Sequence, residues 1–457
     1  MSIFTINKET YKQDLTVDAE CKSLYGEIFT PFELIDNMFN MVDPCMFSDP
    51  SKTFLDAGAG TGFFSMMLYW RLMDGLTDHF TDNTEKSEHI IQNMIYMCEL
   101  REENILLLKS LFGKDSNCHH GNYLEYSNDN FDYIIGNPPY NCNGIKKVPT
   151  NNQKNKKHDG KTIWIDFVKH SVTLLKSNGE LLFIIPSIWM KPDREKTYDF
   201  ITQYKIRKLI CMNNTQTNAF FKGEAQTPTC LLYLTKAAND YQVDIYDQDI
   251  SDYITYTYHD QDPLPVFGAS ILQKIKIDDQ QLQLPKVHKT NMPPKGTILS
   301  SKKSKTAPYP NIRTTVLKQL DPQLVIQYSN KPQAFYGKKK LIMPHKMYGF
   351  PYIDYDGVYG ICNRDSYVIC HDDNTILERL TQFFKTKTAL YLFETTRYRM
   401  KYLERYIFQL IPDITQLEHF PQEINDTTIA DFFGFSDKER DAIQKLHNKK
   451  YSFTYQK

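Results

Sequence analysis

The chain has 457 residues, which is long for one compact domain and favours two. Hydrophobic residues make up 41% of the chain, enough for a proper core, which excludes global disorder. A net charge of -1 would by itself argue against a nucleic-acid partner. The charges are unevenly distributed along the chain, however, so the net value does not exclude one. The N-terminal stretch has no apolar signal-peptide core, and the longest apolar run, around residues 181–185, is too short for a bilayer. A soluble intracellular protein without a membrane partner is therefore expected.

The nine cysteines are scattered and include no CxxC pair, which argues against disulfides and structural zinc. Cys118, His119 and His120 form the nearest approach to a metal cluster, but adjacent residues do not converge easily on one ion. We therefore predict no metal site.

The first half of the chain alternates short apolar runs with helical patterns, which is typical of a sheet with crossover helices. The predicted strands are 53–56, 93–100, 131–136, 179–186 and 229–235; the predicted helices are 63–73, one starting near 101, and 164–175. This rhythm predicts an α/β fold with a mostly parallel sheet through about residue 238.

The composition changes after this point. Residues 240–284 contain nine Asp and two Lys, whereas residues 285–350 contain thirteen Lys or Arg and one acid, Asp321. Residues 341–369 alternate as β-hairpins do, and helical periodicity returns from Asn374, including 390–408. We predict two domains, 1–240 and 241–457, the second a mixed α+β domain.

A glycine-rich turn follows the first predicted strand, in the order Asp56, Ala57, Gly58, Ala59, Gly60, Thr61, Gly62. Glycines allow a tight turn and a close approach to a ligand, but the spacing lacks the third glycine of the dinucleotide fingerprint, where Phe63 stands. An acid at the strand end, Asp56, suits a ligand with an ammonium group, which S-adenosylmethionine (SAM) carries. Glu99 ends the next strand, where a carboxylate can accept both hydroxyls of a ribose; residues 74–92 would then be an insertion.

The most informative motif is Asn137-Pro138-Pro139-Tyr140, directly after the strand 131–136. An exocyclic amino group is a poor nucleophile, and two acceptors on its hydrogens, Asn137 Oδ1 and the Pro138 carbonyl, would aim its lone pair at a methyl donor. Tyr140 can stack on the base. The motif therefore favours methyl transfer to an amino group, without a strong general base if the proton leaves after transfer.

With these motifs in this order, the chain resembles the gamma class of DNA adenine-N6 methyltransferases over residues 24–240. The resemblance implies a Rossmann-like SAM-dependent methyltransferase domain, a C-terminal DNA target-recognition domain, and a target base flipped out of the duplex. It also implies roles for further residues. Cofactor contacts are expected from Thr30, Pro31, Asp56, Ala57, Gly58, Gly60, Glu99, Asn122, Tyr123, Asn137 and Phe167. Asn122 departs from the family, which has an acid there, although its amide carbonyl can still accept from the cofactor's adenine amine.

The flipped base is expected between Tyr140 and Phe221, with Phe220 as the alternative to Phe221. Lysines are the candidates for contacts to DNA phosphates, in the loop 144–160 (Lys146 and Lys147) and in the basic block (Lys338, Lys339 and Lys340). The partner is then double-stranded DNA, and a companion restriction endonuclease is a candidate second partner that the sequence does not decide.

Two alternatives stay open. Asn-Pro-Pro-Tyr also occurs in methyltransferases that act on RNA adenine or on a protein glutamine amide, and a catalytically silent DNA-binding subunit would share the fold. The C-terminal basic block with interleaved aromatic residues favours DNA, Asn at the first motif position favours adenine over cytosine, and the intact motifs favour an active enzyme.

Overall fold

The computed structural model describes residues 2–6, 16, 18–128, 130–143, 161–225, 227–276, 284–318, 321–345, 351–398 and 403–445. The chain divides into two compact units, residues 1–246 and 247–457, six residues after the predicted boundary. No helix in these ranges is long and apolar enough to cross a membrane. The same ranges contain no group of three His, Cys, Asp or Glu side chains placed to hold a metal ion.

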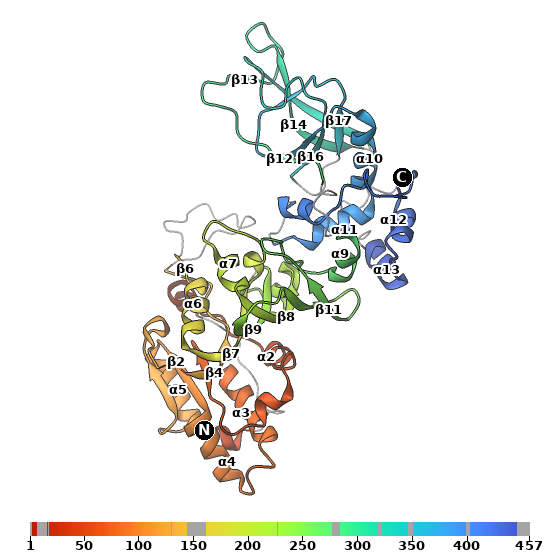
Figure 1. Cartoon of the computed structure of the whole chain (residues 1–457). Coiled ribbons are helices and arrows are strands. Elements are labelled where there is room, and N and C mark those ends of the chain that lie inside the picture. The colour runs from red at the N-terminus through yellow and green to blue at the C-terminus, as the bar shows by residue number, and fades with distance from the viewer. Residues whose placement is uncertain are drawn as a thin grey trace. The chain divides into compact units, whose positions relative to one another are not determined.

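A mixed sheet forms the centre of the first unit, in the strand order β10-β8-β9-β7-β4-β1-β2-β3 (Figure 1). Its strands are β1 (Phe54–Ala57), β2 (Ile95–Glu99), β3 (Asn117–His120), β4 (Phe131–Gly136), β7 (Leu175–Pro186), β8 (Tyr204–Met212), β9 (Thr229–Ala238) and β10 (Gln242–Asp247). Neighbouring strands are parallel except that β9 runs antiparallel to β7 and β8. The predicted α/β fold with a mostly parallel sheet is confirmed.

The central strands are continuous apolar runs because both of their faces are covered. In β7, the five residues 181–185 are all fully buried, although successive side chains point to opposite faces. The helices of this unit are α1 (Ala19–Tyr25), α2 (Phe32–Phe39), α3 (Phe63–Gly75), α4 (Asn83–His89), α5 (Glu102–Phe112), α6 (Trp164–Leu174), α7 (Thr197–Thr202) and α8 (Asn214–Phe220). Side chains of α2, α3 and α5 pack with alternate residues of the central strands into one large apolar core.

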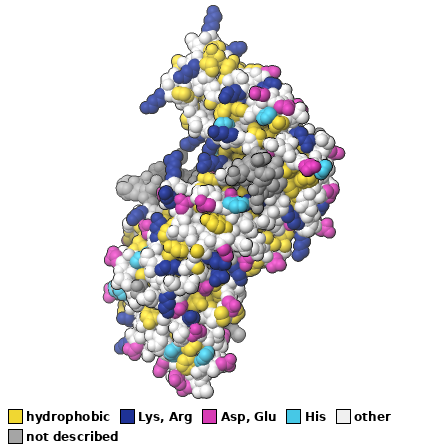
Figure 2. Space-filling model, in the orientation of Figure 1, with side chains coloured by type: hydrophobic (Ala, Val, Ile, Leu, Met, Phe, Trp, Pro, Cys, Tyr) yellow, Lys and Arg dark blue, Asp and Glu magenta, His cyan; other side chains and the backbone are white. Residues whose placement is uncertain are grey.

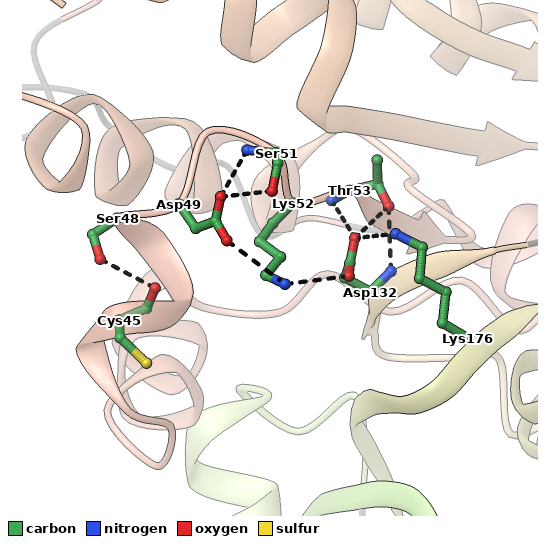
Figure 3. A network of polar contacts seen from close by, with 8 residues as sticks. All are labelled: Cys45, Ser48, Asp49, Ser51, Lys52, Thr53, Asp132 and Lys176. Atoms are coloured by element: carbon green, nitrogen blue, oxygen red, sulfur yellow. Dashed lines mark hydrogen bonds and ion pairs between the residues drawn. The ribbon is translucent and has the colours of Figure 1, made fainter. Parts of the chain in front are cut away.

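A polar network fixes the edge of the sheet at which β1 and β4 begin (Figure 3). The Asp132 carboxylate accepts from Lys176 Nζ at 2.7 Å and from the Thr53 hydroxyl at 3.0 Å, and Lys52 Nζ lies 3.6 Å away. Burial favours the neutral carboxyl, but the bonds from Lys176 and Thr53 outweigh it and hold the pKa of Asp132 below its ordinary value. The network ties two neighbouring strands at their starts, so that their carboxyl ends meet at the opposite edge.

The second unit contains two four-stranded sheets, in the orders β12-β19-β16-β17 and β13-β15-β14-β18, together with helices. Its strands are β11 (Asp252–Thr257), β12 (Val287–Lys289), β13 (Leu299–Ser300), β14 (Tyr309–Lys318), β15 (Asp321–Ser329), β16 (Lys340–Pro344), β17 (Tyr352–Asp354), β18 (Gly360–Ile361) and β19 (Ser366–Cys370). Its helices are α9 (Ala269–Ile275), α10 (Asn374–Phe384), α11 (Lys387–Thr395), α12 (Asp426–Phe432) and α13 (Asp437–Lys445). The unit is therefore mixed α+β.

Antiparallel pairing of β16 with β17 and β19 confirms the hairpins predicted within 341–369. Helix α10 begins at Asn374, as predicted. The helical stretch predicted over 390–408 is wrong at its C-terminal end, because α11 stops at Thr395 and the next helical turn among the described residues is a 3₁₀ turn at Arg405–Gln409. Two adjacent β-branched residues, Thr395 and Thr396, stand where the helix ends, and such side chains favour helix continuation little.

Candidate active site

A cavity of about 530 Å³ lies at the carboxyl ends of β1, β2 and β4. In open α/β sheets this edge is where ligands bind, and the volume falls in the range of small-molecule pockets. The segments that follow the three strands line it, and so does residue stretch 24–30. The positions predicted for cofactor contact that line it are Thr30, Gly58, Gly60, Glu99, Asn122, Tyr123, Asn137 and Phe167.

The glycine turn needs glycine for conformational reasons. Gly58 has φ of 81° and Gly60 has φ of 55°, in the left-handed region that other residues rarely adopt. The backbone N–H groups of Gly58 and Ala59 donate to the Cys98 carbonyl, at 3.1 and 2.9 Å, which holds the turn against β2. A Cβ atom on Gly58 would point toward the Phe167 ring, 3.8 Å from Cε1, so the turn passes close to the wall of the cavity.

Asp56 is the last but one residue of β1, buried behind the turn, and it is not among the residues that line the cavity. Its Oδ2 accepts from the Ser65 hydroxyl at 2.7 Å, while Oδ1 has no hydrogen-bond partner among the described residues. Burial raises the pKa of this carboxyl to about 7. An acceptor left unpaired inside a protein is costly, so Asp56 is prepared for a cationic or donor group.

Glu99 is engaged with the turn rather than free. Its Oε2 accepts from the Gly60 N–H and its Oε1 from the Arg101 N–H, each at 2.8 Å. The carboxylate therefore connects the glycine turn to the end of β2 and still lines the cavity. Oε1 also accepts from Asn104 Nδ2 at 3.3 Å, so it is Oε2 that keeps lone-pair capacity for a hydroxyl group.

One end of the cavity has aromatic walls. The rings of Tyr123 and Phe167 are stacked with centroids 4.9 Å apart, and the Tyr123 hydroxyl lies 2.7 Å from Ser171 Oγ, which fixes both rings. Asn122 uses its Oδ1 to accept from the Leu124 N–H at 3.1 Å and so caps a short 3₁₀ turn. Its role as an acceptor for the cofactor's adenine amine stays a prediction. In that role Oδ1 would accept from the amine and from the Leu124 N–H at once.

Leu100 also lines the cavity and was not identified from the sequence. It is 50% exposed, although leucine is usually buried, and it directly follows Glu99. Its position could have been predicted from the sequence, because an apolar side chain directly follows the acid at the end of a strand. Ala57 and Pro31 lie beside the cavity without lining it: Ala57 is buried in β1 and Pro31 is the N-cap of α2.

The Asn-Pro-Pro-Tyr segment leaves β4 at Gly136 and lies between two cavities. Asn137 Nδ2 donates to the Thr30 hydroxyl at 3.1 Å, which orients the amide. The other amide atom, Oδ1, is buried and finds no partner in the described parts of the chain. Pro139 lines the large cavity, and Asn137 lines both cavities.

The second cavity has a volume of about 10 Å³ and is lined by Gly26, Ile28, Asn137, Pro138, Tyr140, Phe221 and Ala225. Tyr140 and Phe221, chosen from the sequence as stacking partners, thus line one cavity; Phe220 is not among its lining residues. Burial raises the pKa of Tyr140 well above its ordinary value, and its hydroxyl has no partner among the described residues.

The predicted DNA-contacting lysines separate into three groups. Lys146 and Lys147 lie outside the described residues. Lys338 is exposed, and the half-buried Lys339 donates to the Asp372 carbonyl at 3.1 Å. Several Lys and Arg side chains are visible on the part of the second unit that contains β13 and β14, separated by white and yellow atoms (Figure 2).

The prediction for Lys340 is wrong. This side chain is fully buried and its Nζ lies 2.5 Å from Asp354 Oδ2, so it cannot reach a DNA phosphate. Lysine is almost never buried unless it is paired, and Lys340 meets that condition inside the β16–β17 hairpin.

Together these observations define a Rossmann-like α/β domain with a ligand-sized cavity at the carboxyl ends of its strands. Residues 12–220 match the family described as Eco57I restriction-modification methylase, which confirms the resemblance drawn from the motifs. The match spans just under half of the chain.

Two curated relatives are similar to this chain. The type II restriction enzyme and methyltransferase RM.Eco57I of Escherichia coli is 28% identical over 251 residues, covering 51% of this chain and 21% of the relative. Modification methylase CviBIII of Paramecium bursaria Chlorella virus NC1A is 25% identical over 198 residues, covering 40% and 44%. The chain thus spans less than half the length of each relative.

Solved structures are similar at lower identity. The type IIL restriction-modification enzyme MmeI, solved in complex with DNA, is 12% identical with a TM-score of 0.49, over 96% of this chain and 74% of that one. The M protein of the type I restriction enzyme EcoKI is 16% identical with a TM-score of 0.37, over 57% and 55%.

Proposed function

We propose that this protein transfers a methyl group from SAM to N6 of adenine in double-stranded DNA. The observation that carries the proposal is Asn137 Oδ1, which is buried at the junction of the two cavities and has no hydrogen-bond partner among the described residues. An oriented acceptor without a partner is what an exocyclic amino group requires on arrival.

The larger cavity fits SAM by its volume, its close-approach glycine turn and its donor and acceptor set. Behind the glycine turn, Asp56 has a buried oxygen without a partner among the described residues, which suits an ammonium group. Of the lining residues, Glu99 suits a ribose hydroxyl, and Tyr123 and Phe167 with Leu100 suit an adenine ring. When bound, SAM supplies an electrophilic methyl group.

The chain's own residues would then prepare the target amino group. Asn137 Oδ1 accepts one of its hydrogens and the Pro138 carbonyl accepts the other, which draws electron density to the nitrogen. Thr30 holds the Asn137 amide in the orientation that presents Oδ1. Tyr140 and Phe221 hold the base from its two faces, which offsets part of the few kcal/mol that flipping a base costs.

The second unit would serve as the target-recognition domain, with exposed lysines such as Lys338 on DNA phosphates. A companion restriction endonuclease is a candidate partner, since the relatives named above include a restriction enzyme and a modification methylase. A DNA substrate also implies that the enzyme works inside a cell.

Transfer of tritium from labelled SAM to duplex DNA, RNA and protein tests the proposal. We expect label in unmethylated duplex DNA, in a product that digests to N6-methyl-2′-deoxyadenosine. Label in RNA or in glutamine would support the other methyltransferase readings, and no label in any substrate would support a silent subunit; each of these results would overturn the proposal.

Asn137→Ala should reduce the rate by a factor of about 10² or more, the scale of deleting a preorganised polar contact. With 2-aminopurine at the target position, the variant should keep the fluorescence rise that reports flipping. Asn137→Asp is the matched control, because it keeps an oxygen acceptor while losing the donor to Thr30. An Asn137→Ala enzyme with near wild-type rate would remove the amide from the mechanism.

A further inference from the structure

The cavity between Tyr140 and Phe221 is too small for the base that the proposed function places there. About 10 Å³ accommodates about one water molecule. An adenine can enter only if a wall moves. Asn137 and Pro138 directly follow a central strand, so the candidates for movement are the opposite walls.

Two segments form those walls. The first, which we call the strap, is residues 18–30 and contributes Gly26 and Ile28. The second is the turn 221–225, which contributes Phe221 and Ala225. The strap also lines the larger cavity, so it borders both sites.

The strap begins with an element that core packing does not hold. Helix α1 contains no buried residue, so polar contacts fix its position. Asp18 caps its first turn, and Gly26 ends it with φ of 72°. Gly26 lies against the segment after Tyr140, because a Cβ atom there would come 2.0 Å from the Asn141 carbonyl oxygen.

The turn 221–225 follows a helix that is fixed. In α8, the Thr217 hydroxyl lies 3.0 Å from the Thr229 hydroxyl in β9. Beyond it, Lys222 and Gly223 both have positive φ, 47° and 93°, so the chain leaves regular structure there. This irregular turn supports Phe221 from its C-terminal side.

An ion pair joins the two walls: Lys22 Nζ of the strap binds Glu224 Oε2 of the turn. Both side chains are partly exposed, at 25% and 37%, so the pair can open without burying an unpaired charge. We propose that Lys22 and Glu224 are positioning residues that hold Phe221 over Tyr140 and must part each time the target base enters or leaves. This inference rests on the proposed function. It adds that the ion pair sets how long the flipped base stays in the cavity.

The other end of the strap is held separately. Glu27 accepts from Arg101 Nη1 at 2.6 Å and from Asn104 Nδ2 at 3.1 Å, beside the larger cavity. Opening the Lys22–Glu224 pair therefore leaves these bonds intact. Cofactor affinity should not change when this pair is broken.

The recognition sequence is first identified by long-read sequencing of DNA that the protein has methylated. The test is then stopped-flow fluorescence on a duplex with this sequence, in which 2-aminopurine replaces the target adenine. Lys22→Gln and Glu224→Gln should each speed release of the flipped base about two- to fivefold, which is the range of a partly exposed ion pair. The double Gln variant should do no more than either single variant, since one interaction is lost in all three. Exchanging the charges, with Lys22→Glu and Glu224→Lys together, should restore release to within about twofold of wild type.

Lys205→Gln is the matched control. It breaks the similarly exposed Lys205–Asp240 pair at the start of β8, away from the carboxyl ends of the strands, and should leave base release unchanged. Single variants that release the base at the wild-type rate, additive effects in the double variant, or no recovery on charge exchange would each overturn the assignment. If wild type methylates no DNA, the proposed function itself fails; if it methylates and flips normally while the variants match it, only the ion-pair inference fails.

Discussion

Replacing Asp56 with Asn should stabilise the protein while weakening its binding of SAM. Burial raises the pKa of this carboxyl from 3.8 to about 7, so the native state holds a proton that the unfolded state has released. The free energy of unfolding therefore falls as pH rises between about 4 and 7. At 1.36 kcal/mol per pKa unit, the shift amounts to about 4 kcal/mol lost at pH 8. Asp56→Asn keeps an acceptor for Ser65 but cannot ionise, so it should avoid this loss and match wild type near pH 4.

Urea unfolding at pH 4.5 and pH 8, followed by tryptophan fluorescence, measures the effect. The three tryptophans of the chain, Trp70, Trp164 and Trp189, all lie in the same unit as Asp56. Calorimetry should show wild-type SAM affinity rising about tenfold from pH 6 to pH 8, as the carboxylate forms to meet the ammonium group, and a weaker, pH-independent affinity in the variant. A variant less stable than wild type at pH 8, or one with an unchanged pH slope of stability, would refute the reasoning.

Four further predictions concern other parts of the chain. Lys340→Ala should cost about 3 kcal/mol of stability in chemical denaturation, because it leaves the buried Asp354 carboxylate without its counter-ion, with only the N–H groups of Val358 and Tyr359 as donors. Lys338→Ala should leave stability unchanged but flatten the slope of log DNA affinity against log salt by up to about 0.9; equal destabilisation by both variants would contradict the assignment. Gly58→Val should abolish SAM binding in calorimetry and lower the melting temperature, because valine is strained at a φ of 81° and its side chain would approach the cofactor path; retained affinity would exclude the turn from the site. Asp132→Asn should remove stability that wild type has above about pH 4 and loses as pH falls through its lowered pKa, so the variant's acid unfolding curve should be flatter.

The sequence predicted the elements whose side chains have one dominant environment. Strand 131–136 was predicted at its true bounds, and helix 164–175 to within one residue, because one is a buried apolar run and the other a regular amphipathic pattern. Strand 93–100 was predicted too long: a π-helical turn occupies Ile90–Met94 and β2 begins at Ile95. An apolar run alone does not distinguish these conformations.

Strands β3 and β8 were not predicted because neither has the continuous apolar sequence that is typical of a buried strand. Strand β3 reads Asn, Cys, His, His and is only half-buried, as expected at the end of a sheet. Strand β8 carries Lys205, Arg207 and Lys208 between its apolar residues. The site was more predictable than these strands, because motif residues specify backbone turns at strand ends, whereas the inward direction of Lys340 depends on a partner 14 residues away.

The unpaired Asn137 oxygen has a consequence for base selection. Adenine and cytosine present an exocyclic amino group, whereas guanine O6 and thymine O4 are carbonyl oxygens. Beside the Pro138 carbonyl and Asn137 Oδ1, which has no partner among the described residues, a keto oxygen would bring a third acceptor against two others with no hydrogen to share. A site with buried hydrogen-bond acceptors discriminates strongly against an analogue that lacks the matching donors. An apolar pocket that selects by shape alone discriminates much less. The protein would therefore exclude keto bases by a mismatch of hydrogen-bond acceptors at the reacting position. This exclusion would not depend on which flanking bases the second unit recognises.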